Sequence, residues 1–371
     1  MEFSARRSTL LREINLLQGV VEKKNTIPIL TNVLIEASQE SGIKLVATDL
    51  DLTLYTTCEA DVVKPGAIVL QAKKLFDVVR SFPDSDIKVS RGADDWVTIV
   101  CGSSRFRMIS LAKEHFPSTP QAASDGFGIN GKVLHSLIER TIMAITQEES
   151  RYALGGSLFS VFPDRLEMAA TDGHRLALAD APLESNDGVE SKVIIPRKTL
   201  TMLLQLTSAS DDPVRFSRDD NHIFFEVGHR ILTSRMLAGQ FPNYDLVMPK
   251  NNDKSVILPR GELAQSIRRV ALMADERSHG IRFALSDGAL NLTSQTQDVG
   301  EANEAIQAEY KDEPVQIGFN SSYLLDFLNV LDCETVVIEL KEEQSPALLK
   351  PGINEAGASF KYVVMPMRLS H

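Results

Sequence analysis

Six segments with the apolar spacing of amphipathic helices recur along the 371 residues, and this repeat constrains the fold more than any other feature of the sequence. They begin near residues 8, 72, 132, 197, 261 and 321. Leu10 and Ile14 of the first segment recur as Leu134 and Ile138 of the third, 124 residues further on. A shared period is typical of a chain built from repeated structural units.

Between the helical segments, apolar and polar residues alternate, as in Ile43, Leu45 and Ala47. This alternation indicates short antiparallel strands with one solvated face. The Phe-Pro pair at 116–117 returns at 241–242, which agrees with the doubled period. We therefore predict an α+β fold of three similar tandem domains, each with two helices packed on antiparallel sheets. The predicted domains are residues 1–122, 127–248 and 249–371.

Charge is divided between the helices and the rest of the chain. The helical segments carry 15 Lys and Arg against 7 Asp and Glu, although the chain as a whole has a net charge of −11. If the helices line one surface, that surface attracts the DNA backbone without reading its sequence. The alternative is that basic residues simply favour helices while acidic residues collect in turns. The candidates for DNA contact on these segments are Arg7, Arg12, Lys23, Lys24, Arg80, Arg197 and Lys198.

A row of sheets ends in two open strand edges, and open edges invite pairing with another chain. Pairing the first domain of one copy with the third domain of another closes a head-to-tail dimer. The candidates on the first domain are Lys73, Lys74, Arg105, Phe106, Arg107 and Met108. The candidates on the third domain are Leu272 and Met273, with Asp298, Glu301 and Glu304.

Four motifs resemble those of one known family. They are Thr-Asp-Gly-His-Arg-Leu-Ala at 171–177, Ile-Pro-Arg-Lys at 195–198, Gly-Phe-Asn-Ser-Ser-Tyr-Leu at 318–324, and Tyr-Val-Val-Met-Pro-Met-Arg-Leu at 362–369. Together they resemble the DNA polymerase III β subunit family, and the likeness extends in order over essentially the whole chain.

The resemblance implies the DNA-clamp fold, a ring formed by a head-to-tail homodimer, and a non-catalytic role as a sliding clamp that confers processivity in DNA replication. It implies that Arg151 and Tyr152 lie in a DNA-facing loop. It also implies a hydrophobic peptide-binding groove between the second and third domains. The matching groove positions are Leu154, Thr171, Gly173, His174, Arg175, Leu176, Pro242, Val247, Asn320, Tyr323, Val363, Val364, Met365, Pro366, Met367 and Arg368. The implied partners are a second copy, duplex DNA, the DNA polymerase III α subunit, the clamp-loader complex, and other DNA polymerases and repair proteins with clamp-binding peptides.

An enzyme remains the alternative. Asp49-Leu50-Asp51-Leu52-Thr53 after an apolar strand matches the DxDxT pattern of haloacid-dehalogenase-like phosphatases, in which the first Asp is the nucleophile. That fold, however, needs alternating parallel strands and helices, and Thr48-Asp49 falls at the repeat position of Thr171-Asp172. We therefore expect no cofactor and no metal. The sequence has neither a signal-peptide pattern at its start nor an apolar run of membrane-spanning length, so we expect a cytoplasmic protein.

Overall fold

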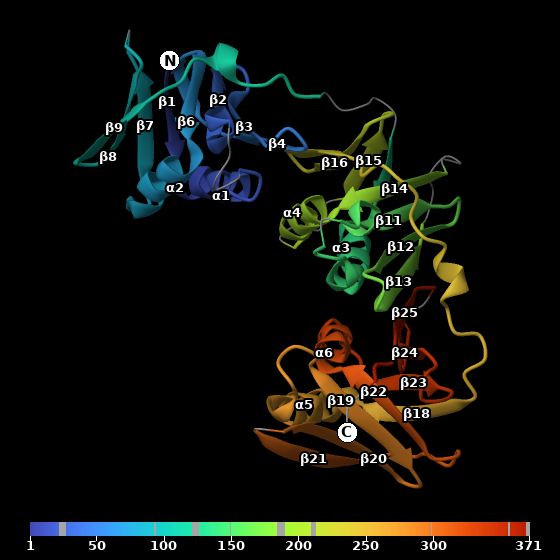
Figure 1. The fold of residues 1–371 in the computed structure, drawn as a ribbon. Coiled ribbons are helices and arrows are strands. Elements are labelled where there is room, and N and C mark those ends of the chain that lie inside the picture. Colours follow the sequence, from blue (N-terminus) through green and yellow to red (C-terminus); the bar gives the residue numbers. More distant parts are fainter. Residues whose placement is uncertain are drawn as a thin grey trace. The chain divides into compact units, whose positions relative to one another are not determined.

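The computed structural model describes residues 1–21, 27–92, 94–120, 126–148, 150–183, 190–208, 213–297, 299–354 and 357–368. It divides into two compact units, Met1–His135 with Lys198–Met236, and Ser136–Arg197 with Leu237–His371 (Figure 1). No helix within these described ranges is long and apolar enough to cross a membrane.

The helices begin where the sequence repeat predicts them. They are α1 (Arg7–Leu17), α2 (Ala72–Ser81), α3 (Gly131–Thr141), α4 (Arg197–Thr207), α5 (Arg260–Val270) and α6 (Ser321–Asn329). Short 3₁₀ turns are η1 (Pro28–Thr31), η2 (Lys113–His115), η3 (Ile142–Ala144), η4 (Tyr152–Leu154), η5 (Tyr244–Leu246) and η6 (Ala271–Met273). Leu10, Ile14 and Leu17 are fully buried, as their spacing along one helical face requires.

Four sheets complete the described structure, and all the strand pairs within them are antiparallel, as predicted. The first sheet runs in the order β5 (Asp61–Lys64), β1 (Glu2–Arg6), β7 (Asp86–Arg91), β8 (Trp96–Cys101) and β9 (Ser104–Ile109). The second runs β10 (Gly126–Ile129), β15 (Val214–Arg218), β16 (His222–Val227), β17 (Arg230–Arg235), β4 (Leu52–Cys58), β3 (Gly42–Thr48), β2 (Asn32–Ser38) and β6 (Gly66–Gln71). The third runs β14 (Ser191–Pro196), β11 (Gly156–Val161), β12 (Arg165–Thr171), β13 (Arg175–Pro182), β25 (Ser359–Val364), β24 (Ala347–Pro351), β23 (Thr335–Leu340) and β18 (Lys254–Pro259). The fourth runs β21 (Gly300–Gln307), β20 (Ala289–Thr296), β19 (Gly280–Ser286) and β22 (Val315–Asn320).

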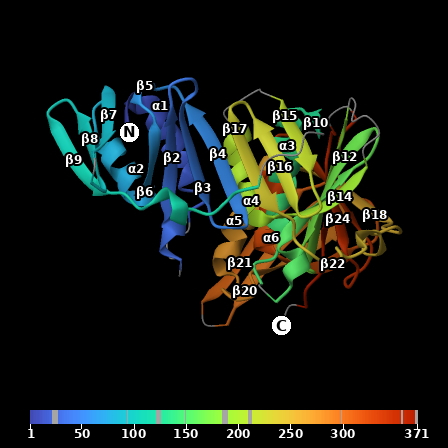
Figure 2. The same cartoon turned by 90° about the horizontal axis from the view of Figure 1, so that it is seen from above.

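Both eight-stranded sheets are assembled from strands of two successive repeats. In the second sheet, β4 pairs with β17, with Thr56 opposite Arg230 (Figure 2). In the third sheet, β13 pairs with β25, with Leu176 opposite Val363. We call these pairings the first joint and the second joint. Each joint lies within one compact unit.

The first joint contains a buried ion pair. Glu13 of α1 is fully buried, and both of its carboxylate oxygens accept hydrogen bonds from Arg230 of β17, at 2.7 and 2.9 Å. Thr56 and Arg12 donate to the same carboxylate, at 2.6 and 2.9 Å. Burial by itself would raise the pKa of Glu13, but the hydrogen bonds from Arg230, Thr56 and Arg12 outweigh it and lower the pKa to about 2.

The segments that leave the sheets repeat a backbone contact. The amide of Leu111 donates to Val69 of β6, at 3.0 Å, and the amide of Leu237 donates to Ile194 of β14, also at 3.0 Å. The amide of Met367, near the C-terminus, donates to Gly318 of β22 at 2.8 Å. The C-terminal segment is therefore held on its sheet in the same way as the segments that follow β9 and β17 are held on theirs.

Candidate peptide-binding site

The second joint carries an apolar cluster with partly exposed residues packed against it. Leu176, Leu348 and Val363 form its buried base, and Tyr244 and Met248 pack partly buried against them. We call these five residues the second-joint patch. Val247, which precedes Met248 in the sequence, is 48% exposed, and Met365, which follows β25, is 40% exposed. We call these two residues the rim of the patch. Such a base with flexible side chains around it suits the apolar anchors of a short peptide.

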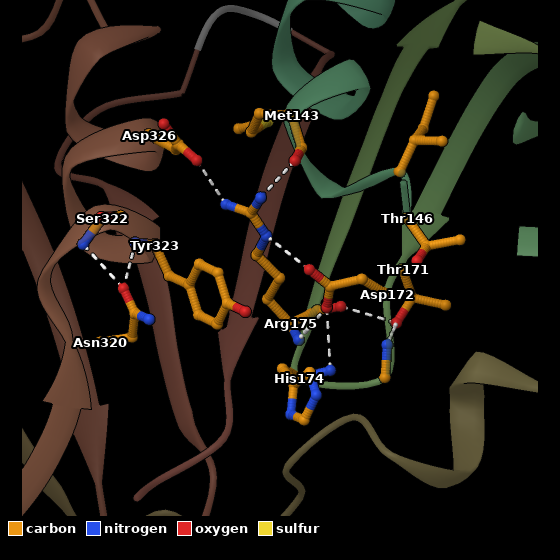
Figure 3. Close-up of polar contacts among 12 residues, drawn as sticks. Met143, Thr146, Thr171, Asp172, His174, Arg175, Asn320, Ser322, Tyr323 and Asp326 are labelled. Carbon is orange, nitrogen blue, oxygen red and sulfur yellow. Dashed lines mark hydrogen bonds and ion pairs between the residues drawn. The ribbon is translucent and has the colours of Figure 1, made fainter. Parts of the chain in front are cut away.

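The turn between β12 and β13 positions one wall of this site. The Asp172 carboxylate accepts hydrogen bonds from the amides of His174 and Arg175, at 2.9 and 3.0 Å, and Thr171 donates to the carbonyl of Arg175 at 2.6 Å (Figure 3). Gly173 has a φ of +89°, a conformation that favours glycine. The amide of Met365 donates to the carbonyl of His174 at 2.9 Å, which ties the C-terminal segment to the turn.

Arg175 is anchored by several partners beside the patch. Its guanidinium donates to Asp172 at 3.0 Å and to Asp326 at 2.5 Å, and it also binds the Met143 carbonyl (Figure 3). It donates as well to the Tyr362 hydroxyl, at 3.1 Å. Burial would lower the pKa of Arg175, but Tyr362, Asp326 and Asp172 raise it. With these bonds made, Arg175 shapes the wall of the site by fixing α6 and β25 in place.

Asn320 and Tyr323 are also held by local structure. The Asn320 side chain caps α6 by accepting from the amides of Ser322 and Tyr323, and it donates to the Ser278 carbonyl at 3.1 Å (Figure 3). The Tyr323 ring lies under the Arg175 guanidinium, 4.3 Å from its centroid. A polar residue at the N-cap satisfies amides that the helix itself cannot pair.

All sixteen predicted groove residues lie in one compact unit. Leu176, Val363 and Met365 lie at the patch or its rim, whereas Val364 is fully buried inside the sheet. Tyr244, Met248 and Leu348 belong to the patch but are not among the sixteen predicted groove residues. The recurrent Phe-Pro at 241–242 pointed to the segment that carries Tyr244 and Met248.

The Tyr244 hydroxyl donates a hydrogen bond to Glu167 at 2.5 Å. Burial, and to a lesser extent the contact with Glu167, raises the pKa of Tyr244.

Several predicted DNA-facing side chains are engaged within the protein. Arg7 donates to the carbonyls of Val79 and Arg80 at the end of α2, at 3.3 and 2.8 Å. Lys198 binds the Asp49 carboxylate and the Val20 carbonyl. Three further candidates form ion pairs: Arg12 with Glu13, Arg80 with Asp77, and Arg151 with Glu148. Arg197 donates to the Ile145 carbonyl, and Tyr152 is exposed. Lys23 and Lys24 lie outside the described residues.

The predicted subunit contacts fall on two sheet edges. Arg105, Phe106 and Met108 are on β9, which ends the first sheet, and Glu301 and Glu304 are on β21, which ends the fourth. Phe106 is 40% exposed and Leu272 of η6 is 76% exposed, large values for apolar side chains. Lys73 and Lys74 are on α2, and Met273 follows Leu272 in η6. Asp298 lies outside the described residues.

The phosphatase alternative finds no support. Asp49 and Asp51 lie in the turn of an antiparallel hairpin, where the Asp49 carboxylate accepts from the amides of Asp51 and Leu52, at 3.0 and 2.6 Å. Among the residues that the structure describes, no group of three His, Cys, Asp or Glu side chains could hold a metal ion. Asp49 is thus a turn and ion-pair residue of the scaffold.

Comparisons with known proteins agree over the full length. Models of the N-terminal, central and C-terminal domains of the DNA polymerase III beta subunit match residues 1–120, 128–243 and 245–368. The beta sliding clamp of Pseudomonas aeruginosa is 36% identical and that of Escherichia coli is 32% identical, with 100% of both chains covered in each case. Among solved structures, a Pseudomonas aeruginosa sliding clamp bound to griselimycin has a TM-score of 0.93 at 36% identity, again over 100% of both chains. A Bacillus subtilis sliding clamp has a TM-score of 0.94 at 25% identity and the same coverage.

These matches confirm the predicted fold class of three tandem clamp domains and the predicted family. The chain belongs to the DNA polymerase III beta subunit family of sliding clamps.

Proposed function

We propose that the chain is a non-catalytic DNA sliding clamp, which closes around duplex DNA as a ring of two copies and tethers DNA polymerases through an apolar groove. The observation that carries this proposal is the repeated joint. Strand edges meet at β4–β17 and at β13–β25, while among the described residues the equivalent edges β21 and β9 stay open. Pairing β21 of one copy with β9 of another would use the third edge in the same way, and two copies would close the ring.

The repeat supplies the register of this third joint. Gly102 and Gly228, both at a φ of 57°, occupy the same place in the β8–β9 and β16–β17 hairpins, so Ser104 corresponds to Arg230. In the first repeat, Thr56 binds Glu13 of α1, and in the third repeat, Glu304 binds Arg269 of α5. Both helices are the first of their repeat, so Thr56 and Glu304 are equivalent positions. Because Thr56 pairs with Arg230, Glu304 should pair with Ser104 of the other copy.

This register gives Phe106 a partner position. It places Phe106 opposite Ala302, as Leu232 lies opposite Leu54 in the first joint and Tyr362 opposite Ala177 in the second. Leu232 and Tyr362 are fully buried, whereas Phe106 is not. Burial of Phe106 would remove this difference between the three repeats. A hollow of about 550 Å³ beside it, lined in part by Lys74, Val78 and Met108, would receive Leu272 and Met273 of the other copy.

We further propose the domain boundaries 1–122, 127–248 and 249–371, and a DNA-facing role for the exposed Tyr152 and Arg80. The proposed partners are duplex DNA, the DNA polymerase III α subunit, the clamp-loader complex, and other DNA polymerases and repair proteins. Such a role places the protein in the cytoplasm with the chromosome.

DNA retention is expected to be topological. Protein loaded by a clamp loader onto nicked circular duplex should stay bound through a wash in moderate salt, because ionic contacts weaken while the ring remains closed. Linearising the same DNA should release it. Gel filtration of labelled protein with circular or linearised DNA measures both states. Equal retention on the two forms would reject the ring and favour direct binding.

Removal of residues 365–371 is expected to abolish peptide binding. The deletion takes away Met365 at the rim of the second-joint patch and the backbone bond from Met365 to His174. A few buried anchors usually carry most of the affinity in such sites, each contributing about 2 kcal/mol or more. Fluorescence anisotropy of a labelled peptide with a Gln followed by Leu and Phe anchors measures the effect.

A point variant separates groove loss from a general disturbance. Val247→Ala at the rim should weaken peptide binding. Ile257→Ala, which truncates a comparably exposed aliphatic side chain on β18, should leave peptide binding unchanged. Unchanged binding in the truncated chain would mean that the C-terminal segment is scaffold only.

A further inference from the structure

An exposed apolar pair lies beside the open edge of the first domain. Trp96 of β8 and Ile109 of β9 are directly opposite each other in the sheet, and they are 42% and 61% exposed. Arg107 lies over the Trp96 ring, 4.9 Å from its centroid, and forms an ion pair with Asp94 at 3.3 Å. Large apolar side chains gathered at an unpaired edge indicate a contact surface.

These residues lie on the face of the sheet away from the helices. Phe106 packs edge-to-face on Phe82 with ring centroids 5.5 Å apart, and it shares a hollow with residues of α2. Successive side chains of a strand point to opposite faces, so Arg107 and Ile109 point away from the helices. The hollow that Phe106 and Met108 line is also lined by Arg107 and Ile109 at the strand edge, but not by Trp96. The contact made by Phe106 and Met108 therefore does not cover Trp96.

The register of the proposed third joint identifies what would cover them. With Glu304 opposite Ser104, antiparallel pairing sets Glu301 opposite Arg107 and Val299 opposite Ile109. Glu304 binds Arg269 of α5, so Glu301 lies on the face away from the helices, the same face as Arg107. Val299 is 66% exposed, and its amide donates to the Thr296 carbonyl at 3.1 Å, which fixes the turn before β21.

We propose that the subunit contact has a second, outer layer, in which Arg107 pairs with Glu301 and the side chains of Trp96 and Ile109 cover Val299 of a second copy. A second copy of the chain is the partner for this surface. At the register given by the two internal joints, the acidic Glu301 lies opposite Arg107, and the apolar Val299 lies opposite Ile109. This inference rests on the proposed ring but adds an outer layer whose residues differ from those of both internal joints. In the second joint, the position of Arg107 is held by Val363, which lies opposite Leu176 at the base of the second-joint patch. In the first joint, the position of Arg107 is held by Thr233, a buried residue opposite Thr53.

Trp96 supplies a direct readout, because it is the single Trp of the chain. Dilution of the full-length protein from dimer to monomer should shift its fluorescence emission to longer wavelength, since Trp96 would pass from an apolar contact into water. The midpoint of the shift should match the dimer dissociation constant from analytical ultracentrifugation. A dimer that dissociates without any change in Trp96 emission would overturn the outer layer.

Substitutions test the pairing itself. Ile109→Ser and Val299→Ser should each raise the dissociation constant roughly tenfold, while Ile257→Ser, on an exposed aliphatic of β18, should leave it unchanged. Arg107→Glu and Glu301→Arg should each weaken the dimer, and the double variant should regain affinity, since each joint then has the reversed pair. All these side chains are exposed, and circular dichroism checks that the variants fold.

The outcomes distinguish the layer from the ring. If Phe106→Ala weakens the dimer while Ile109→Ser and Val299→Ser do not, the ring stands and the outer layer is overturned. If the unmodified protein is a monomer at micromolar concentration, the proposed ring itself is overturned.

Discussion

A chain with Leu272→Ala and Met273→Ala is expected to be a folded monomer at low micromolar concentration. Leu272 is 76% exposed in η6, so its truncation costs the isolated chain little. In the proposed third joint, both side chains enter the hollow beside Phe106 and Met108. Truncating buried aliphatic side chains costs about 2–5 kcal/mol each, which raises the dissociation constant by orders of magnitude. Light scattering after gel filtration measures the mass.

The matched control is a chain with Ile257→Ala and Ile353→Ala, which removes comparably exposed aliphatic groups from the same domain. It should stay dimeric. The monomeric variant should also lose retention on circular DNA while still binding the groove peptide, because the second-joint patch lies elsewhere in the chain. A double variant at 272 and 273 that remains fully dimeric would locate the subunit contact elsewhere.

Replacing Arg230 with Met should lower the free energy of unfolding by about 3–5 kcal/mol, the usual cost of removing one partner from a buried ion pair. Glu13 would then be left fully buried with only Thr56, Arg12 and the nearby His229 as partners. Urea unfolding followed by circular dichroism measures the loss. The double variant Glu13→Leu with Arg230→Met should recover much of it, because apolar replacements of both partners leave no uncompensated charge. If the single variant is as stable as the parent, the ion pair does not hold the first joint.

The same pair predicts an acid dependence. The pKa of Glu13 is lowered from 4.5 to about 2, so the pair stabilises the fold fully above pH 4.5 and loses its contribution as the pH falls towards 2. A shift of this size corresponds to about 3 kcal/mol. Stability of the parent should therefore fall more steeply over this range than that of the double variant. Parallel acid-titration curves for the two proteins would contradict the assignment.

The sequence predicted the helices well because their apolar residues repeat with the helical period and are buried in the structure. Leu10 and Ile14 face the core as expected, and α1, α3 and α5 start within one residue of the predicted positions. The alternation in β3 identified an antiparallel strand for the same reason. The second-joint patch was predicted only in part, through the resemblance of the motifs at 171–177 and 362–369 to a known family.

The joints could not be predicted, since strand pairing joins residues far apart in the sequence. Nothing local pairs Glu13 with Arg230 or Arg175 with Asp326, because the partners are brought together only when β4 meets β17 and β13 meets β25. Arg7 shows that charge in the sequence can also suggest a role that the side chain's own contacts do not support. Its charge suggested a role towards DNA, but its guanidinium binds the last carbonyls of α2. Formal charge alone does not distinguish a side chain that serves a helix end from one that serves a ligand.

The bond from Met367 to Gly318 has a consequence for engineering the ring. Leu111 and Leu237 make the equivalent bond where the chain leaves one domain for the next. The C-terminal segment therefore leaves its sheet in the same way as the two segments that lead into a following domain. In a closed ring, that following domain is the first domain of the other copy. Two chains joined head to tail by a segment like residues 110–127 should thus form a covalently continuous clamp with a single opening seam. Such a molecule would stay assembled at any dilution, and the mechanics of its one seam could be studied apart from dimer dissociation.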